Sequence, residues 1–295
     1  MNEKTGHETS TPTKNPARLD PEEAFTDFLQ GLEAYVPVVP GWLEAARTVE
    51  QQLQPLAEKA IPSLVALARM DWAAIKRRLD ELPEKSKAAM ILASSKGWFF
   101  GWNDGLQSLM ELVEKLGATQ AGEIDGVMAE YYRMNLKPFA DELISKYPDR
   151  AAAIKAAVKA HLSLGDEGYL LSIPVFIAQA DGLLAEITNE KSAMKREGKG
   201  GELRASKVLR AKLAGDQESL DLVHQILTLH ESDFLKSEAA RQIATQASGE
   251  SFTALNRHQV MHGESSHYGT EINSLKAFSL LVCVGAHLPA VLERG

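Results

Sequence analysis

The stretch "EINSLKAFSLLVCVGAHLPAVL", residues 271–292, ends in the longest apolar run of the chain. Its apolar part is interrupted by polar residues, a glycine and a proline, whereas a bilayer span needs about 20 predominantly apolar residues. Thr270 can cap a helix that begins here, and Glu271 lies near the positive end of that helix. We therefore expect a buried core helix, and not a membrane anchor, around which the fold is built.

Apolar residues recur at helical spacing through most of the chain. We find no run of alternating β-branched residues bounded by hairpin turns, so a sheet is not expected. The predicted fold class is all-α. A helix is expected to open at residue 20 or 21, and the other candidates are residues 42–60, 62–82, 84–95, 96–117, 119–147 with a break before Pro138, 150–164, 173–189 with a start near Pro174, 203–214, 217–234, 237–245 and 271–292.

Three regions are predicted along the chain. Residues 1–19 are polar, lack the apolar core of a signal peptide and form a disordered leader. Residues 20–148 form a helical N-terminal domain of unassigned role. The pattern restarts after "KYPDR", so residues 149–295 form a second helical domain. Each half is large enough for its own core.

Composition limits the function classes. The 295-residue chain carries a formal net charge of -8, which argues against a protein that coats nucleic acid over its whole surface. A local basic patch is still compatible with RNA binding. Cys283 is the single cysteine, so no internal disulfide can form, and this fits a reducing cytoplasm.

One segment is basic. Residues 191–212 hold eight lysines and arginines against two glutamates, a local balance of +6. Its centre, "REGKGGE", is too glycine-rich for a stable helix. The segment is either a solvated loop or a mobile basic flap that holds RNA phosphates. In the second case the side chains in contact with substrate are Lys195, Arg196, Lys199 and Arg204.

The stretch "LNRHQVMHGESSHYGTEINSL", residues 255–275, contains three of the chain's 8 histidines. His258 and His262 are four residues apart and share a face if the segment is helical. Arg257 and His262 are five apart, about 140° around an ideal helix. Bringing these two together requires a helix end, or a second copy of the segment packed across a two-fold axis.

Arginine and histidine together suit metal-free cleavage of a phosphodiester. Histidine titrates near neutral pH and can take or give a proton. Arginine stays charged and can hold a phosphate through two donors while charge builds in the transition state. If the substrate is RNA, its own 2′-hydroxyl is the nucleophile, and a cyclic phosphate is left.

At these residues the chain resembles the HEPN-domain family. "RHQVMH", residues 257–262, fits the family signature of an arginine, four to six residues and a histidine, with a polar residue after the arginine. "YLLSIPVFIAQADGLL" upstream and "YGTEINSLKAFSLL" downstream also look like a poorly characterised group of bacterial HEPN-like proteins. The resemblance covers roughly residues 150–295.

The resemblance implies a helical bundle that dimerises through the motif region. It implies a metal-independent endoribonuclease of toxin systems, phage defence or RNA processing, with a cognate regulator or antitoxin as a possible partner and no cofactor. Arg257 and His262 match the catalytic pair, and His258 matches the residue that orients them.

Asp181 lies in the apolar stretch "FIAQADGLLAEI" and would be costly there without a partner. It either fixes the geometry of Arg257 from an earlier helix or lies on an exposed helix stripe. Asn256 and Tyr268 are weaker candidates for substrate contact, because each can equally cap a helix or line a loop.

Two other readings stay open. His258, His262, Glu264 and His267 could bind a transition metal, although Gln259 stands where an H-E-x-x-H site needs its glutamate. The domain could also be a non-catalytic interaction module whose histidines bond across a dimer interface. No phosphate-binding loop of the G-x-x-x-x-G-K-[ST] type follows an apolar strand, so nucleotide hydrolysis is unsupported.

Overall fold

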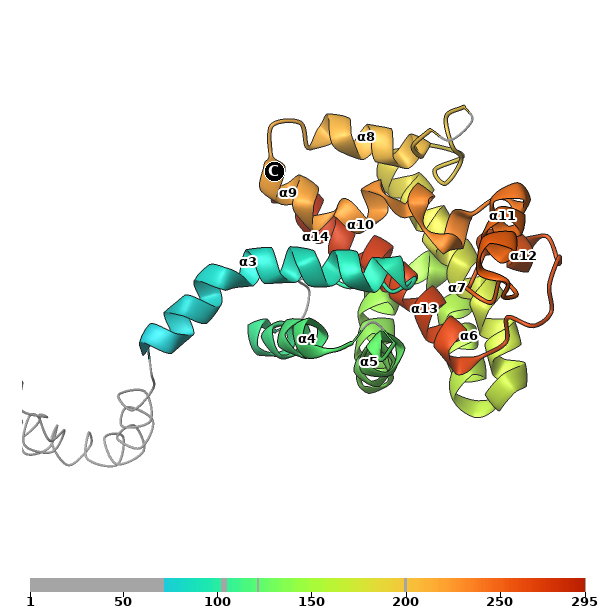
Figure 1. Cartoon of the computed structure of the whole chain (residues 1–295), viewed down its shortest axis with the longest axis horizontal. Coiled ribbons are helices and arrows are strands. Elements are labelled where there is room, and N and C mark those ends of the chain that lie inside the picture. Colours follow the sequence, from blue (N-terminus) through green and yellow to red (C-terminus); the bar gives the residue numbers. More distant parts are fainter. Residues whose placement is uncertain (1–71, 102–104, 121, 199–200, 295) are drawn as a thin grey trace, which may run out of the picture. The chain divides into compact units, whose positions relative to one another are not determined.

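The computed structural model describes residues 72–294, apart from 102–104, 121 and 199–200. The predicted leader at 1–19 and the helices expected up to residue 71 lie outside these residues. In the described part every regular element is helical, which confirms the all-α class (Figure 1). The elements are α3 (Trp72–Ser95), α4 (Leu106–Ala118), α5 (Ile124–Lys146), η1 (Pro148–Arg150), α6 (Ala151–Ser163), α7 (Gly165–Thr188), α8 (Arg204–Lys212), α9 (Gln217–Leu222), α10 (His224–Leu227), η2 (Leu229–Glu231), η3 (Asp233–Leu235), α11 (Glu238–Ser248), α12 (Arg257–Met261), α13 (Glu271–Val282), the π-helical turn η4 (Cys283–His287) and α14 (Leu288–Leu292).

The centre of the fold is α13 with its continuation through η4 and α14, which is the apolar helix predicted at 271–292. All side chains from Asn273 to Val282 are buried, and α13 packs against α7 and α5. The Asn273 backbone N–H donates to Thr270 Oγ1 at 3.2 Å, so the predicted cap is confirmed. Burial of Cys283 raises its thiol pKa to about 12, as expected of a small core residue.

Two helical stretches, residues 165–188 and 271–292, are long and apolar enough to cross a membrane. Length and composition alone are weak support for a span, because a core helix has the same properties. In the second stretch 83% of the apolar window is buried inside the fold. That burial is what the sequence predicted for a core helix, and a cytoplasmic location stays a prediction.

Residues 77–295 form one compact unit. The boundary predicted near residue 148 falls inside it, and helices from both sides contribute to one hydrophobic core. For example, the Tyr132 ring of α5 meets the Phe278 ring of α13 edge-on, with centroids 6.3 Å apart. In the described residues, helices on both sides of residue 148 therefore share one core.

The link between α3 and α4 runs through the core. Trp98, Phe99 and Phe100 are each at most 1% exposed, so these rings belong to a core between helices. Gln225 of α10 bonds both backbone groups of Phe100, at 3.2 and 2.9 Å. The Tyr132 hydroxyl donates to the Phe99 carbonyl. The backbone groups of Phe99 and Phe100 are thus bonded by side chains.

Prolines do not end helices where the sequence predicted. Pro138 lies inside α5, and Pro174 lies inside α7, which begins at Gly165 and not near residue 173. The missing N–H at each ring removes one helical bond. Both helices bury apolar residues within two positions on each side of the proline, and that packing holds the helix together across it; these residues are Leu136 and Phe139 in α5, and Ile173 and Phe176 in α7. The reverse error occurs at 217–234, where one expected helix is divided into α9, α10, η2 and η3.

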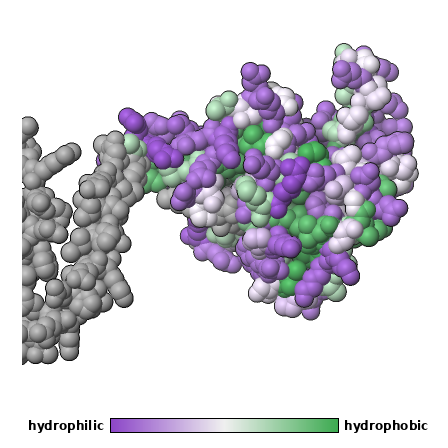
Figure 2. Space-filling view, turned by 90° about the horizontal axis from the view of Figure 1, so that it is seen from below, coloured by the Kyte–Doolittle hydropathy of each residue, from purple (hydrophilic) through white to green (hydrophobic). Residues whose placement is uncertain are grey.

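One face of the surface is mixed in character. Figure 2 shows hydrophilic and apolar residues interspersed over this face. Large hydrophobic side chains in the described region that are more than half exposed are Met134, Leu162, Leu171 and Ile243. Single exposed apolar residues are ordinary on a protein surface.

Candidate functional site

The predicted motif lies on α12, a helix of five residues. Asn256 caps its start, since its side chain accepts the Gln259 backbone N–H at 3.2 Å. Gly263 follows with a φ of +69°, a conformation that favours glycine and stops the helix. Arg257 is therefore the first residue of the helix and His262 is its C-cap residue. A helix end was one of the two arrangements that the sequence allowed for bringing Arg257 and His262 together, and α12 has an end on each side of the motif.

A buried arginine holds both ends of α12. Arg241 of α11 has a side chain only 8% exposed. Its Nη1 donates to Asn256 Oδ1 at 3.1 Å and to the Lys236 carbonyl at 3.0 Å. Its Nη2 pairs with the Glu264 carboxylate, just after the helix. One guanidinium thus ties the cap before α12 to the turn after it.

The Arg257 guanidinium faces α7, the helix against which α12 packs. Its Nη2 donates to Asp181 Oδ2 at 2.7 Å, and the two side chains are 24% and 28% exposed. The contact predicted between an acidic residue of an earlier helix and this arginine is therefore present. Arg257 Nε is buried and has no hydrogen-bond partner within the described residues. The arginine thus keeps an unused donor beside its ion pair.

The described residues between α7 and α8 belong to a basic loop. Asn189 ends α7 in the left-handed conformation, and Arg196 and Leu203 form an isolated antiparallel bridge. The Arg204 backbone N–H donates to the Lys195 carbonyl at 3.0 Å. Arg196 Nη2 donates to the carbonyls of His230 and Leu235, and no carboxylate of the described residues pairs with this guanidinium. These bonds attach the base of the loop to the fold.

The basic loop, α7 and α12 enclose a groove of about 850 Å³, which we call the basic groove. Its cationic side chains come from two different elements, the loop and α12, and a single carboxylate, from α7, is among them. The lining comprises Ala178, Asp181, Gly182, Ala185, Lys191, Ser192, Met194, Lys195, Arg196, Leu235, Ser237, Arg257, His258 and Met261. Five residues predicted as site residues, Asp181, Lys195, Arg196, Arg257 and His258, are thus brought together.

His258 and His262 stack on each other, as their four-residue spacing predicted. Their ring centroids are 5.8 Å apart, with an angle of 12° between the planes. Burial and the nearby charge of Arg257 lower the pKa of His258 from its usual value of 6.5, so its ring is neutral at pH 7. His262 is exposed and lies outside the lining of the basic groove. Within one chain, His262 therefore does not contact the groove itself and contacts His258, which lines it.

Three histidines share a lowered pKa, and burial is the first cause in each. We call His161, His258 and His287 the low-pKa histidines. His161 Nδ1 bonds the Ser274 hydroxyl at 2.8 Å, and His287 Nε2 bonds the Leu222 carbonyl at 2.8 Å. His287 is thus the satisfied core residue that its apolar helix suggests.

Three of the four remaining predicted site residues, Asn256, Arg204 and Tyr268, do not line the basic groove. Asn256 is 1% exposed, and its amide nitrogen donates to the carbonyls of Asp233 and Lys236 while its oxygen caps α12. Arg204 pairs with Glu190 at 3.2 Å. Tyr268 is half-buried against the core, outside the basic groove. Lys199 lies outside the described residues. Of these four, Asn256 has a clear structural task in shaping the site.

Sequence reasoning missed three contributors to this site. Lys191 and Ser192 line the basic groove, and Arg241 supports α12. Lys191 was recognisable only as one charge of the basic segment. Arg241 lies 15 residues before Asn256 and 23 before Glu264, and nothing in their spacing signals the contact.

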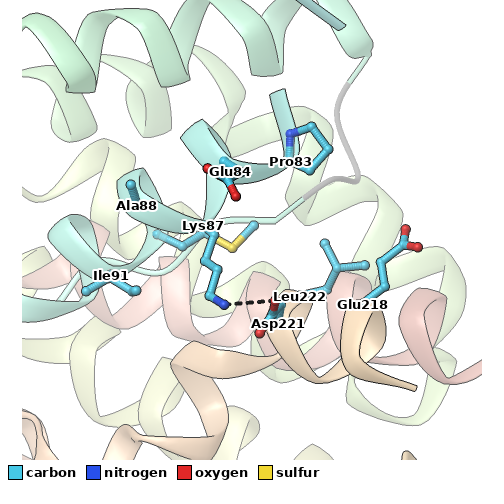
Figure 3. Close-up of a pocket in the computed structure, with 9 residues that line it drawn as sticks. Pro83, Glu84, Lys87, Ala88, Ile91, Glu218, Asp221 and Leu222 are labelled. Atoms are coloured by element: carbon cyan, nitrogen blue, oxygen red, sulfur yellow. Dashed lines mark hydrogen bonds and ion pairs between the residues drawn. The ribbon is translucent and has the colours of Figure 1, made fainter. Parts of the chain in front are cut away.

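A second groove, of about 630 Å³, lies between α3 and α9 (Figure 3). Lys87 and Asp221 point toward each other there, with Nζ and Oδ2 2.9 Å apart. Leu222, Ala88 and Ile91 supply apolar surface. None of the predicted site residues lines it, and its central charges neutralise each other.

Metal binding gains no support from side-chain positions in the described region. There, no group of three or more His, Cys, Asp or Glu side chains is arranged to hold a metal ion. Glu264, one of the ligands considered, is paired with Arg241.

The chain was compared with known proteins at three levels. No protein-family model matches it, and no curated protein or solved structure is significantly similar to it. The account of function therefore rests on the residues of the basic groove and on α12.

Proposed function

We propose that the protein is a metal-independent endoribonuclease of the HEPN type, acting as a homodimer. The observation that supports this most is the basic groove, where Arg257 lies beside Asp181 and His258 within a lining otherwise rich in cations. An arginine that lines the groove is suited to hold a phosphate, and the neutral His258 beside it stacks on His262, the histidine assigned to proton transfer.

The proposed reaction uses the substrate's own nucleophile. The RNA 2′-oxygen attacks the adjacent phosphorus and loses its proton to a histidine base. The bond from phosphorus to the 5′-oxygen breaks, and that oxygen receives a proton. The products are a 2′,3′-cyclic phosphate and a 5′-hydroxyl. In this scheme Arg257 stabilises the charge on the phosphate oxygens, His262 acts in proton transfer, and His258 and Asp181 orient them.

A dimer is proposed because His262 is exposed and does not line the groove of its own chain. In a symmetric dimer that joins two α12 segments, each segment meets its copy, and the paired arginines and histidines converge. The proposal predicts a mass in solution of about 64 kDa, twice the 32.2 kDa of one chain.

Cleavage by purified protein after treatment with EDTA tests this function. Wild type is expected to cleave single-stranded RNA, while Arg257→Ala and His262→Ala are each expected to lose cleavage and keep the far-ultraviolet circular dichroism of the fold. His267→Ala is the matched control, since His267 is also exposed but follows α12. Equal cleavage by His262→Ala and His267→Ala would refute the assignment of His262.

An alternative is a non-catalytic RNA-binding or dimerisation module. The pairing of Arg257 with Asp181 is compatible with it, because an ion pair can be purely structural. Wild-type protein that binds RNA and dimerises but never cleaves any RNA supplied would favour this module. A toxin or phage-defence role, a cognate regulator and a cytoplasmic site of action belong to the same proposal. Growth arrest on induction of wild type, absent with His262→Ala, tests the toxin role.

A further inference from the structure

The charges of the basic segment divide into two sets. Lys207 pairs with Glu197 and Arg210 with Glu202, each at 3.0 Å. Arg204 pairs with Glu190. These cations lie on α8 or at its start and are neutralised locally. A sequence balance of +6 therefore overstates the charge that this segment offers to a ligand.

The second set lines the basic groove. Lys191 and Lys195 are exposed, and neither ammonium group has an ion pair or hydrogen bond to any described residue. The bridge at Arg196 and the backbone bond to the Lys195 carbonyl fix the loop that carries them. Two unpaired ammonium groups are thus held on the loop wall of the groove, beside the Arg196 guanidinium, which donates to backbone carbonyls.

Arg257 is on a different wall, formed by α12, and its carboxylate partner Asp181 is the single acidic residue of the lining. The groove therefore has two unpaired ammonium groups on its loop wall and, on the α12 wall, a guanidinium whose bond to Asp181 uses only Nη2. A ligand with one phosphate can contact the cations of only one wall. A strand with consecutive phosphates can contact the cations of both walls.

The low exposure of Arg257 in the groove favours a single strand over a duplex as the ligand. The Arg257 side chain is only 24% exposed, so a phosphate reaches it only if the backbone that carries it enters the groove. A single strand can do so. In a duplex the second strand and the paired bases hold the backbone on the outside of a wide, stiff cylinder.

We infer that Lys191 and Lys195 form a second phosphate subsite, and that the groove holds one single RNA strand across at least two phosphates. The reacting phosphate lies at Arg257 and a neighbouring phosphate lies at the two lysines. This inference rests on the proposed function for the identity of the strand. The subsite itself rests on the division between paired and unpaired charges.

The test uses a single-stranded DNA oligonucleotide, which lacks the 2′-hydroxyl and cannot be cleaved by the proposed reaction. Its affinity is measured by fluorescence anisotropy over a series of salt concentrations. The variant Lys191→Gln/Lys195→Gln is compared with Lys207→Gln/Arg210→Gln, which removes the same charge from the paired set. For single strands each phosphate contact contributes roughly 0.7 to the slope of log affinity against log salt concentration.

Loss of the phosphate contact at the two lysines is expected to lower the magnitude of that slope by roughly 0.7, with little change in the control variant. Equal loss in the two double variants would overturn the subsite. A duplex of the same length that competes as well as the single strand would overturn the single-strand assignment. Wild type that binds with the expected salt pattern but never cleaves RNA would refute the proposed function and leave the subsite standing.

Discussion

Loss of the Arg241 guanidinium is expected to lower the free energy of unfolding, by an amount that can be worked out from its contacts. Arg241→Met removes a buried charge that bonds Asn256, the Lys236 carbonyl and the Glu264 carboxylate, and keeps a side chain of similar length. Two of the partners retain another donor. Asn256 Oδ1 still accepts the Gln259 N–H, and the Lys236 carbonyl still accepts the Asn256 amide.

The expected cost follows from this accounting. Glu264 is 40% exposed and can be hydrated when its partner is lost, so the penalty of an isolated buried charge does not apply in full. One charge-assisted bond and two weaker ones then correspond to a loss of about 2–4 kcal/mol in the free energy of unfolding. The α12 cap is expected to loosen as well, which would lower any activity of Arg257.

Arg133→Met is the matched control. Arg133 also pairs with a glutamate, Glu271, through two bonds of 2.6 and 2.8 Å, but the two side chains are 50% and 33% exposed. Such a surface pair contributes about 0–1 kcal/mol. Urea unfolding followed by circular dichroism compares the two variants with wild type. A loss in Arg241→Met no larger than in Arg133→Met would refute the reasoning.

Two further predictions concern the core and pH. Gly101→Ala places a Cβ 2.1 Å from the buried His287 ring and is expected to lower the free energy of unfolding by about 1–3 kcal/mol. Gly117→Ala, whose Cβ meets open space in α4, is expected to raise it by about 0.5–1 kcal/mol, and equal shifts of the two variants in a thermal melt would contradict this. The low-pKa histidines have folded pKa values below the unfolded value of 6.5, so the unfolded state binds more protons between those values. The contribution of these neutral histidines to the free energy of unfolding is therefore fully present above pH ~6.5 and is lost as the pH falls below that value. Urea unfolding midpoints that stay constant or rise from pH ~7.5 to ~5.5 would contradict this.

Local signals account for the parts of the fold that the sequence predicted. Helical spacing of apolar residues located the core helix at 271–292, and Thr270 marked its start. A carboxylate among apolar residues pointed to a partner for Asp181, and Arg257 is that partner. Each of these follows from a pattern within a few residues or from the cost of an unpaired charge.

The features that the sequence did not predict depend on tertiary packing. Helices continue through Pro138 and Pro174 because buried residues on either side hold them, and local propensity carries no record of that packing. The support of α12 by Arg241 and the pairing of the α8 cations depend on residues that meet only in the folded chain. The sequence therefore predicted the groove's charged residues better than it predicted which charges are free.

The central claim is that the 2′-hydroxyl of RNA is the nucleophile at the basic groove. The most direct measurement supplies purified wild type with two RNA strands that differ by one 2′-deoxy substitution at the mapped cleavage site, and identifies the product ends by mass spectrometry. The account predicts a 2′,3′-cyclic phosphate and a 5′-hydroxyl from the unmodified strand, and no cleavage at the substituted position. Cleavage at the substituted position, or products that end in a 5′-phosphate, would contradict it.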